Sequence, residues 1–356
     1  NSGVDLVISI DFSKECVKNR EVISIANAFN WEFGDKTVFV QDNNLGLREH
    51  TLKCGDLLLA KFDSIIMLED DGFASPYFYE YVLESLKLFH DDDNVCGISL
   101  YSPKVHEYTG LEFVPLDDGS DNYFVQSASS WGQVWSRRQW SLFKEWYNQK
   151  SGCGVTLEDR VPAAVAGWPE SSWKKYFIKY QVETNRFFAF PRISLSSNFG
   201  DTGTHFTVDS DVNQTPLLAK SKLWNLSSLS QSMAKYDCFY EIQNLSMDTF
   251  FHKDLEFDLY GIKRLINVSS EYLVSAKKCR YPIKQYSLKL KPSVLNVIYG
   301  IAGSELSYGK TIDFEDQNRY SIFRGYEHLS IRFLCRLLIY KSKGYAKRIF
   351  SRMGAN

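Results

Sequence analysis

The sequence lacks paired cysteines, an excess of one charge and a long apolar run. Its seven cysteines are dispersed and none belongs to a C-x-x-C pair, which indicates buried thiols in a reducing compartment rather than a disulfide framework. We find no signal peptide and no stretch of the roughly 18 apolar residues that a membrane-spanning helix needs. The net charge of -2 argues against binding to nucleic acid through bulk electrostatics.

What the sequence does contain is an aromatic-rich chain of 356 residues with no internal repeat, enough for one large domain or two ordinary ones. Apolar runs predict four strands, at residues 4–11, 37–42, 64–69 and 95–101. Helical patterns separate them, and one helix is expected to start at Ser75 and Pro76. This alternation predicts an α/β fold with a mostly parallel, Rossmann-like sheet, in which ligands bind at the carboxyl ends of the strands.

The pattern changes along the chain, and three regions are expected. Residues 1–210 form the α/β domain, and residues 211–328 form a C-terminal region with no recognisable role. Residues 329–356 are a basic tail, because from Ser330 onward there are seven Lys or Arg residues and no acid. The tail's basic amphipathic pattern favours docking on an anionic membrane surface. The alternative is a solvated helix that packs on its own domain.

Three adjacent acids, Glu69, Asp70 and Asp71, follow the predicted strand at residues 64–69. Like charges this close repel one another and raise each other's pKa unless a positive charge lies among them. Mg²⁺ and Mn²⁺ often take one or two protein carboxylates and complete their coordination with water or substrate phosphate. The acids therefore predict a metal and nucleotide diphosphate site, and the alternative is a solvated acidic loop.

The stretch "IIMLEDDGFASPYFYEYV" resembles the signature of GT-A glycosyltransferases, most closely that of the N-acetylglucosaminyltransferase I group. Three further segments fit that group or its bacterial relatives in surface-polysaccharide assembly: "NNLGLREH", "SSWGQVWSRRQW" (residues 129–140) and "FPRISLSSNFGDTGTHF" (residues 190–206). The resemblance covers about residues 4–206 and implies a GT-A fold. The family has an earlier strand that packs against the nucleotide base, whereas this sequence begins at the next strand.

The resemblance implies roles for residues that bind the nucleotide and the sugar. Asp11 matches the position that holds the uracil, although it could instead cap the helix that follows it. Arg48 falls near a second base-contacting position, with His50 as the alternative; both could also lie on a solvated helix face. Glu69 and Asp70 match residues that contact the ribose and the sugar.

For the metal and the donor sugar, the resemblance implies a second group of residues. Asp71 matches the direct ligand of Mn²⁺ or Mg²⁺, and His205 is a candidate for the metal or the far side of the diphosphate. The turn at Trp131 and Gly132 matches the wall beside the donor sugar. The competing interpretations are core packing for the tryptophan and a structural role for the histidine.

The catalytic base is the point at which the sequence departs from the family. The family's base lies in a W-D-D-W segment, whereas the matching "ESSWKKYF" has Lys174 and Lys175 in place of the two acids. A lysine is a poor base unless burial lowers its pKa strongly. We therefore expect Glu170 to take the role. Further candidates are Glu183, Asp201 and Asp121.

These features together predict a metal-dependent, inverting glycosyltransferase that moves a sugar, with N-acetylglucosamine a candidate, from a UDP-sugar to a glycan or lipid-linked acceptor. Dispersed thiols and the basic tail favour capsule or O-antigen assembly in the cytoplasm, peripheral to the inner face of a bacterial plasma membrane. The alternative is a GT-A-like binding or scaffold protein that has lost catalysis. A nucleotidyltransferase would need a Gly-rich signature near the N-terminus, and the sequence has none.

Overall fold

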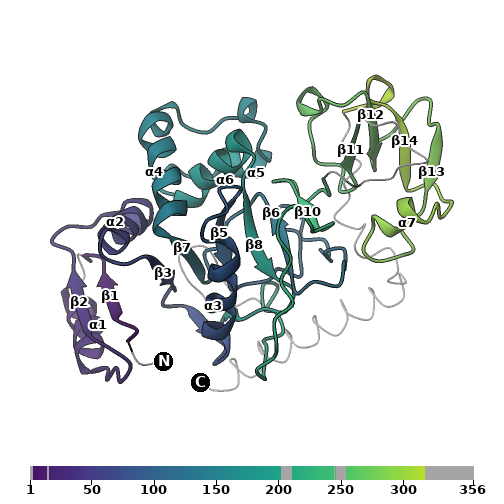
Figure 1. The fold of residues 1–356 in the computed structure, drawn as a ribbon. Helices are drawn as coiled ribbons and strands as arrows, with labels where there is room; N and C mark the ends of the chain where they lie inside the picture. Colours follow the sequence, from purple (N-terminus) through teal and green to yellow (C-terminus); the bar gives the residue numbers. More distant parts are fainter. Residues whose placement is uncertain (1–2, 14–15, 202–210, 244, 246–253, 317–356) are drawn as a thin grey trace, which may run out of the picture.

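The computed structural model describes residues 3–13, 16–201, 211–243, 245 and 254–316. The fold is α/β with mixed sheets (Figure 1). Among the predicted features, His205 and the tail at 329–356 lie outside the described residues. No helix within the described ranges is both long and apolar enough to cross a bilayer.

The central sheet has six strands in the order β10-β6-β8-β5-β7-β3. Their bounds are β3 Ser64–Met67, β5 Val95–Ser99, β6 Asn122–Val125, β7 Gln133–Ser136, β8 Phe187–Pro191 and β10 Lys235–Tyr236. The expectation of a mostly parallel sheet is wrong here, because β7 runs antiparallel to both β3 and β5, and β6 runs antiparallel to β8. A helical crossover between two strands makes them parallel neighbours. The strands β6 and β7 follow loops after residue 102 instead, and they can therefore run antiparallel to their neighbours.

The described residues contain helices that cover both faces of this sheet and others that lie with the smaller sheets. They are α1 Cys16–Ala28, α2 Gly46–Lys61, α3 Phe78–Phe89, α4 Arg137–Lys150, α5 Ala163–Gly167, α6 Trp173–Thr184 and α7 Leu295–Ile298, with short 3-10 turns at Ser151–Cys153, Leu157–Asp159, Leu265–Asn267 and Thr311–Asp313. Helices α2, α4 and α6 pack on one face and α3 on the other. Successive side chains of a strand point to opposite faces of its sheet. On β7, Trp135 therefore packs in the core beneath α2, α4 and α6, and Val134 packs in the core beneath α3.

Two helix starts show how local sequence sets element boundaries. Helix α4 begins after Ser136, whose hydroxyl accepts from the amide of Gln139 in a capping box. Helix α3 begins at Phe78, slightly later than predicted. The Ser75 hydroxyl accepts from the Tyr77 amide but also donates to the Leu218 carbonyl at 2.6 Å. Ser75 thus anchors the later segment to the start of α3.

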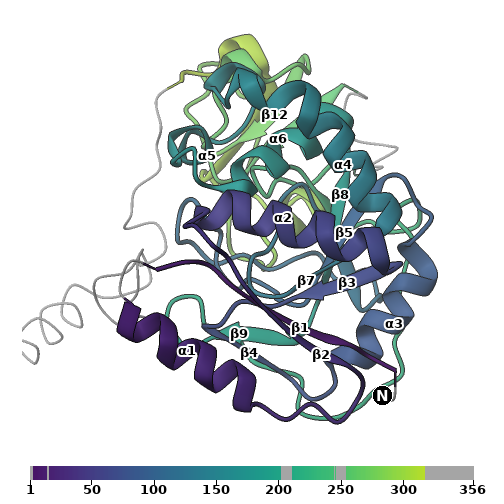
Figure 2. The ribbon, with the colours of Figure 1, turned by 90° about the vertical axis from the view of Figure 1, so that its left-hand side faces the viewer.

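Smaller sheets complete the fold (Figure 1). Strands β1 (Leu6–Ile10) and β2 (Lys36–Val40) form a parallel pair beside α1, and β4 (Gly72–Ala74) pairs antiparallel with β9 (Ser196–Asn198). A four-stranded sheet near the C-terminus contains β11 Leu255–Asp258, β12 Tyr272–Ser275, β14 Leu306–Lys310 and β13 Lys284–Tyr286. Figure 2 shows β4 and β9 side by side.

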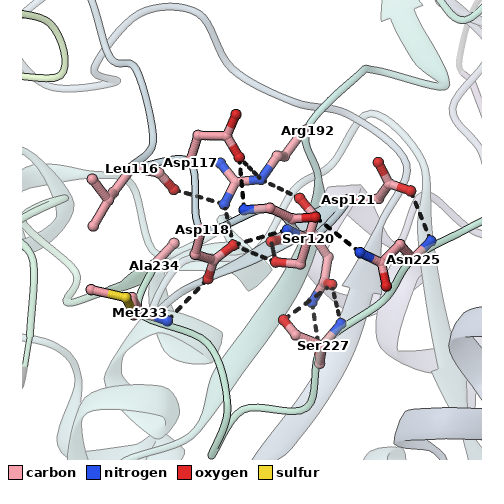
Figure 3. Close-up of polar contacts among 12 residues, drawn as sticks. Leu116, Asp117, Asp118, Ser120, Asp121, Arg192, Asn225, Ser227, Met233 and Ala234 are labelled. Carbon is pink, nitrogen blue, oxygen red and sulfur yellow. Dashed lines mark hydrogen bonds and ion pairs between the residues drawn. The ribbon is translucent and has the colours of Figure 1, made fainter.

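The segment at 211–243 belongs with the central sheet. Strand β10 extends that sheet beyond β6, so the change to the four-stranded sheet falls after residue 243 rather than at residue 210. A network around Arg192 anchors this segment (Figure 3). The guanidinium donates to the Leu116 carbonyl at 2.7 Å and pairs with Asp118 at 2.8 Å, while the other Asp118 oxygen accepts from the Met233 amide at 3.0 Å.

Candidate functional site

The site lies where three neighbouring strands present their ends at one edge of the central sheet. In the register of β3, β7 and β5, Met67 is opposite Gln133, and Gln133 is opposite Ser99. Because β7 is antiparallel to its neighbours, its start meets the carboxyl ends of β3 and β5. The Glu69-Asp70-Asp71 segment and the Trp131-Gly132 turn therefore leave the sheet at the same edge.

The three predicted acids are uncompensated within the described part of the chain, where none of them forms an ion pair. Burial, with Asp71 and Asp70 adding their repulsion, raises the pKa of Glu69 to about 7, and the positive charge of Lys174 partly offsets this. Asp70 and Asp71 are exposed, and partial desolvation of the Asp71 carboxylate, followed by the charge of Asp70, raises the pKa of Asp71. Such a cluster is electrostatically suited to a cation.

Polar atoms without partners surround the same edge. Both amide atoms of Gln133, the Ser129 hydroxyl and the carbonyl oxygen of the Asn198 side chain find no hydrogen-bond partner among the described residues. Gln133 is only 1% exposed, so its unmade hydrogen bonds are costly unless a ligand or water completes them. Orphaned donors and acceptors beside unpaired carboxylates fit a polar, negatively charged ligand held through a cation.

The returning segment at 190–201, part of the predicted resemblance, also reaches this edge. Asn198 on β9 pairs with Gly72, directly after the acids, and the Phe199 amide donates to the Asp71 carbonyl at 3.3 Å. Gly132 has φ of +91°, and a Cβ there would meet Leu100 at 3.0 Å. Only glycine suits that turn, and its role beside the donor sugar remains a prediction.

Trp131, beside that glycine, is half-buried and lies edge-on to Tyr101, with ring centroids 4.7 Å apart. Trp135 and Trp140, from the same segment, are buried in the core. Core packing therefore explains Trp135 and Trp140. Trp131 instead lies at the edge of the sheet where the three acids follow β3.

Asp11 bonds the start of α2 rather than capping α1, the helix that directly follows it. Its carboxylate accepts from the amides of Phe12 at 2.8 Å, Leu45 at 2.9 Å and Gly46 at 2.9 Å, at the start of α2. Although burial alone would raise the pKa of Asp11, these three donors hold it below its usual value. Nearby, the His50 ring bonds the Ser9 hydroxyl at 2.7 Å. Uracil binding by Asp11 remains a prediction.

The structure brings Arg48 and Glu170 together. The Arg48 guanidinium lies 3.9 Å from the Glu170 carboxylate and 5.1 Å from the Tyr176 ring centroid. Glu170 also pairs with Lys175 at 2.6 Å and accepts from the Tyr176 hydroxyl. The Lys175 and Tyr176 hydrogen bonds lower the pKa of Glu170, which weakens this carboxylate as a base.

Two of the further candidates for the base have structural partners. Asp121 pairs with Lys222 at 2.5 Å and accepts from the Asn225 amide at 2.8 Å, as part of the network in Figure 3. Glu183 accepts from the Trp146 indole at 2.9 Å. Both carboxylates thus hold other parts of the chain in place.

Sequence reasoning missed Glu107. Its carboxylate pairs with Lys174 at 2.6 Å and accepts from the Tyr240 hydroxyl at 3.2 Å. In the sequence, Lys174 was notable only because it replaces an acid of the family's W-D-D-W segment. No sequence motif surrounds Glu107, and only the fold places this loop residue beside α6.

No cluster of three metal-ligating side chains occurs within the part of the chain that the structure describes. A cation at Asp71 would therefore depend on oxygen atoms from water or a bound diphosphate, which is common for Mg²⁺. No protein-family model matches the chain. A search of curated proteins likewise finds no match.

Proposed function

We propose that the protein is a GT-A glycosyltransferase that uses a UDP-sugar and Mn²⁺ or Mg²⁺ and inverts the anomeric centre. The single observation that carries the proposal is the group of three unpaired carboxylates at a sheet edge, next to a buried glutamine with no partner. A divalent cation with a diphosphate would satisfy both, because the ion neutralises the acids and the nucleotide offers hydrogen-bonding groups.

In this proposal each group has a chemical task. Asp71 would hold the ion, which stabilises the negative charge that develops on the leaving diphosphate. Glu69 and Asp70 would accept hydrogen bonds from the ribose and the sugar, and Trp131 with Gly132 would line the donor sugar. A separate carboxylate must take the proton of the attacking hydroxyl. Titration of UDP into the protein with and without Mn²⁺ tests the donor site, and we expect binding that depends on the ion.

Binding of UDP with Mn²⁺ is expected to weaken as the pH falls from 8 to 6. Glu69, with a pKa of about 7, is ionised above pH 7 and protonated below it, and a nearby cation favours the ionised form. Binding therefore releases a proton and loses up to about tenfold in affinity for each pH unit below the pKa. Calorimetry across this range measures the slope. In Glu69→Gln the slope should become shallower, leaving the part that the terminal phosphate of UDP contributes with its pKa of about 6, and an unchanged slope would show that Glu69 is not the titrating group.

The basic tail is expected to bring the protein to an anionic membrane, where a lipid-linked acceptor would lie. Deleting residues 330–356 removes seven basic residues and should reduce pelleting with phosphatidylglycerol vesicles, most strongly at low salt. Neutral phosphatidylcholine vesicles serve as the control. Equal pelleting of the full and shortened chains would favour the tail packing on its own domain.

A second candidate is a catalytically inactive binding or scaffold protein of the same fold. The observation that favours it is that Glu170, the predicted base, is engaged by Lys175, Tyr176 and Arg48. Release of UDP from UDP-sugars separates the two candidates. An inactive protein would bind UDP with Mn²⁺ and turn over none of UDP-N-acetylglucosamine, UDP-N-acetylgalactosamine, UDP-glucose and UDP-galactose.

A further inference from the structure

A cluster around Glu107 lies beside the strand-end site. The Glu107 carboxylate contacts Lys174 at 2.6 Å through one oxygen and Tyr240 at 3.2 Å through the other. The Lys174 ammonium also lies 5.5 Å from the Trp168 ring centroid. The side chain of Glu107 remains 29% exposed, so a substrate hydroxyl can reach it.

A ring contact and two charges connect this cluster to the three acids and the Trp131 wall. Trp173, the residue before Lys174, packs against Trp135 of β7 with ring centroids 5.8 Å apart. The positive charge of Lys174 lowers the pKa of Glu69, and the negative charge of Glu107 raises the pKa of Tyr101. Tyr101 in turn lies against Trp131. Since Tyr101 follows β5 and Glu69 follows β3, the cluster joins two strands that end at the same edge of the sheet.

We propose that Glu107 is the base that deprotonates the acceptor hydroxyl, with the half-buried Trp168 beside it as an aromatic surface for a saccharide acceptor and the buried Tyr240 holding the carboxylate in place. The inference rests on the proposed function. The acceptor oxygen forms a bond to the anomeric carbon of the UDP-sugar as its proton passes to the Glu107 carboxylate. The bond from the anomeric carbon to the phosphate oxygen breaks, and its electron pair leaves with UDP.

The structure favours Glu107 over Glu170 for this role. Both carboxylates pair with a lysine and a tyrosine, but Glu170 also faces the guanidinium of Arg48 at 3.9 Å. Lys174 of the Glu107 pair lowers the pKa of Glu69, which ties this pair to the three acids. Lys174, which replaces an acid in the resemblance, therefore positions a base supplied by a different loop.

The test compares Glu107→Gln with Glu170→Gln, using the intact chain. UDP release from the four UDP-sugars with Mn²⁺ measures transfer to water, and calorimetry measures UDP affinity. We expect Glu107→Gln to lower turnover by about 10²–10⁴-fold. The UDP affinity of this variant should stay within about threefold of the wild-type affinity. Glu170→Gln should retain turnover within about tenfold. Glu107→Asp, which keeps the carboxylate, should recover part of the lost rate.

Other results would contradict either the assignment of Glu107 or the proposed function. Turnover of Glu107→Gln close to that of the wild type overturns the assignment of the base, as does a loss confined to Glu170→Gln. Failure of the wild-type protein to bind UDP with Mn²⁺ overturns the proposed function itself. Wild-type binding without turnover of any donor overturns the base and supports the inactive alternative. Melting temperatures of all variants show whether a lost rate reflects unfolding.

Discussion

Replacing Asp71 with asparagine is expected to abolish Mn²⁺-dependent UDP binding and turnover while leaving the fold intact or more stable. The loss should reach about 100-fold or more, because an ion-to-phosphate contact supplies several kcal/mol. Stability should not fall, since burial and Asp70 raise the pKa of Asp71. A carboxylate with a raised pKa destabilises the folded state above that pKa, and asparagine removes this cost. Calorimetry and thermal melting at pH 8 measure the two effects.

Asp91→Asn is the matched control. Asp91 is exposed, pairs with His90 at 3.1 Å and precedes β5, whereas the three acids follow β3. The same chemical change at Asp91 should leave both UDP affinity and melting temperature unchanged. UDP affinity that survives in Asp71→Asn, with Mn²⁺ still required, would place the ion elsewhere.

Replacing Trp135 with alanine is expected to destabilise the fold by about 3–5 kcal/mol. The side chain is fully buried, and its ring centroid lies 5.0 Å from that of Trp140 and 5.8 Å from that of Trp173. Alanine would leave a cavity between the central sheet and helices α4 and α6, which cannot collapse without moving several rings. The urea concentration at the unfolding midpoint, with the melting temperature, measures the loss.

Trp131→Ala separates packing from function in the same segment. Trp131 is half-buried and contacts the Tyr101 ring, so its removal should cost only about 1 kcal/mol. It should lower the affinity for a UDP-sugar more than the affinity for UDP, because its proposed contact is with the sugar. Equal destabilisation by the two alanine variants would make Trp131 a core residue and remove it from the donor site.

The strand-helix alternation in the first hundred residues could be predicted from the sequence because it is local. Strands appear in the sequence as short apolar runs, and the Ser75-Pro76 pair lies within a few residues of the start of α3 at Phe78. The direction of β7 could not be predicted. Its placement between β3 and β5 depends on contacts between residues far apart along the chain, which no local pattern records.

Some features of the candidate site could likewise be predicted from the sequence, and others depended on the tertiary structure. By itself, the sequence determined that three acids follow an apolar strand and that a glycine stands beside Trp131, because adjacency is a property of neighbouring residues. Only the tertiary structure decided which carboxylates have partners. It pairs Glu170 with Lys175 and Arg48, uses Asp11 to cap α2, and brings Glu107 to Lys174. The availability of a charge depends on the groups that the fold places within a few ångströms of it, and those lie far away in the sequence.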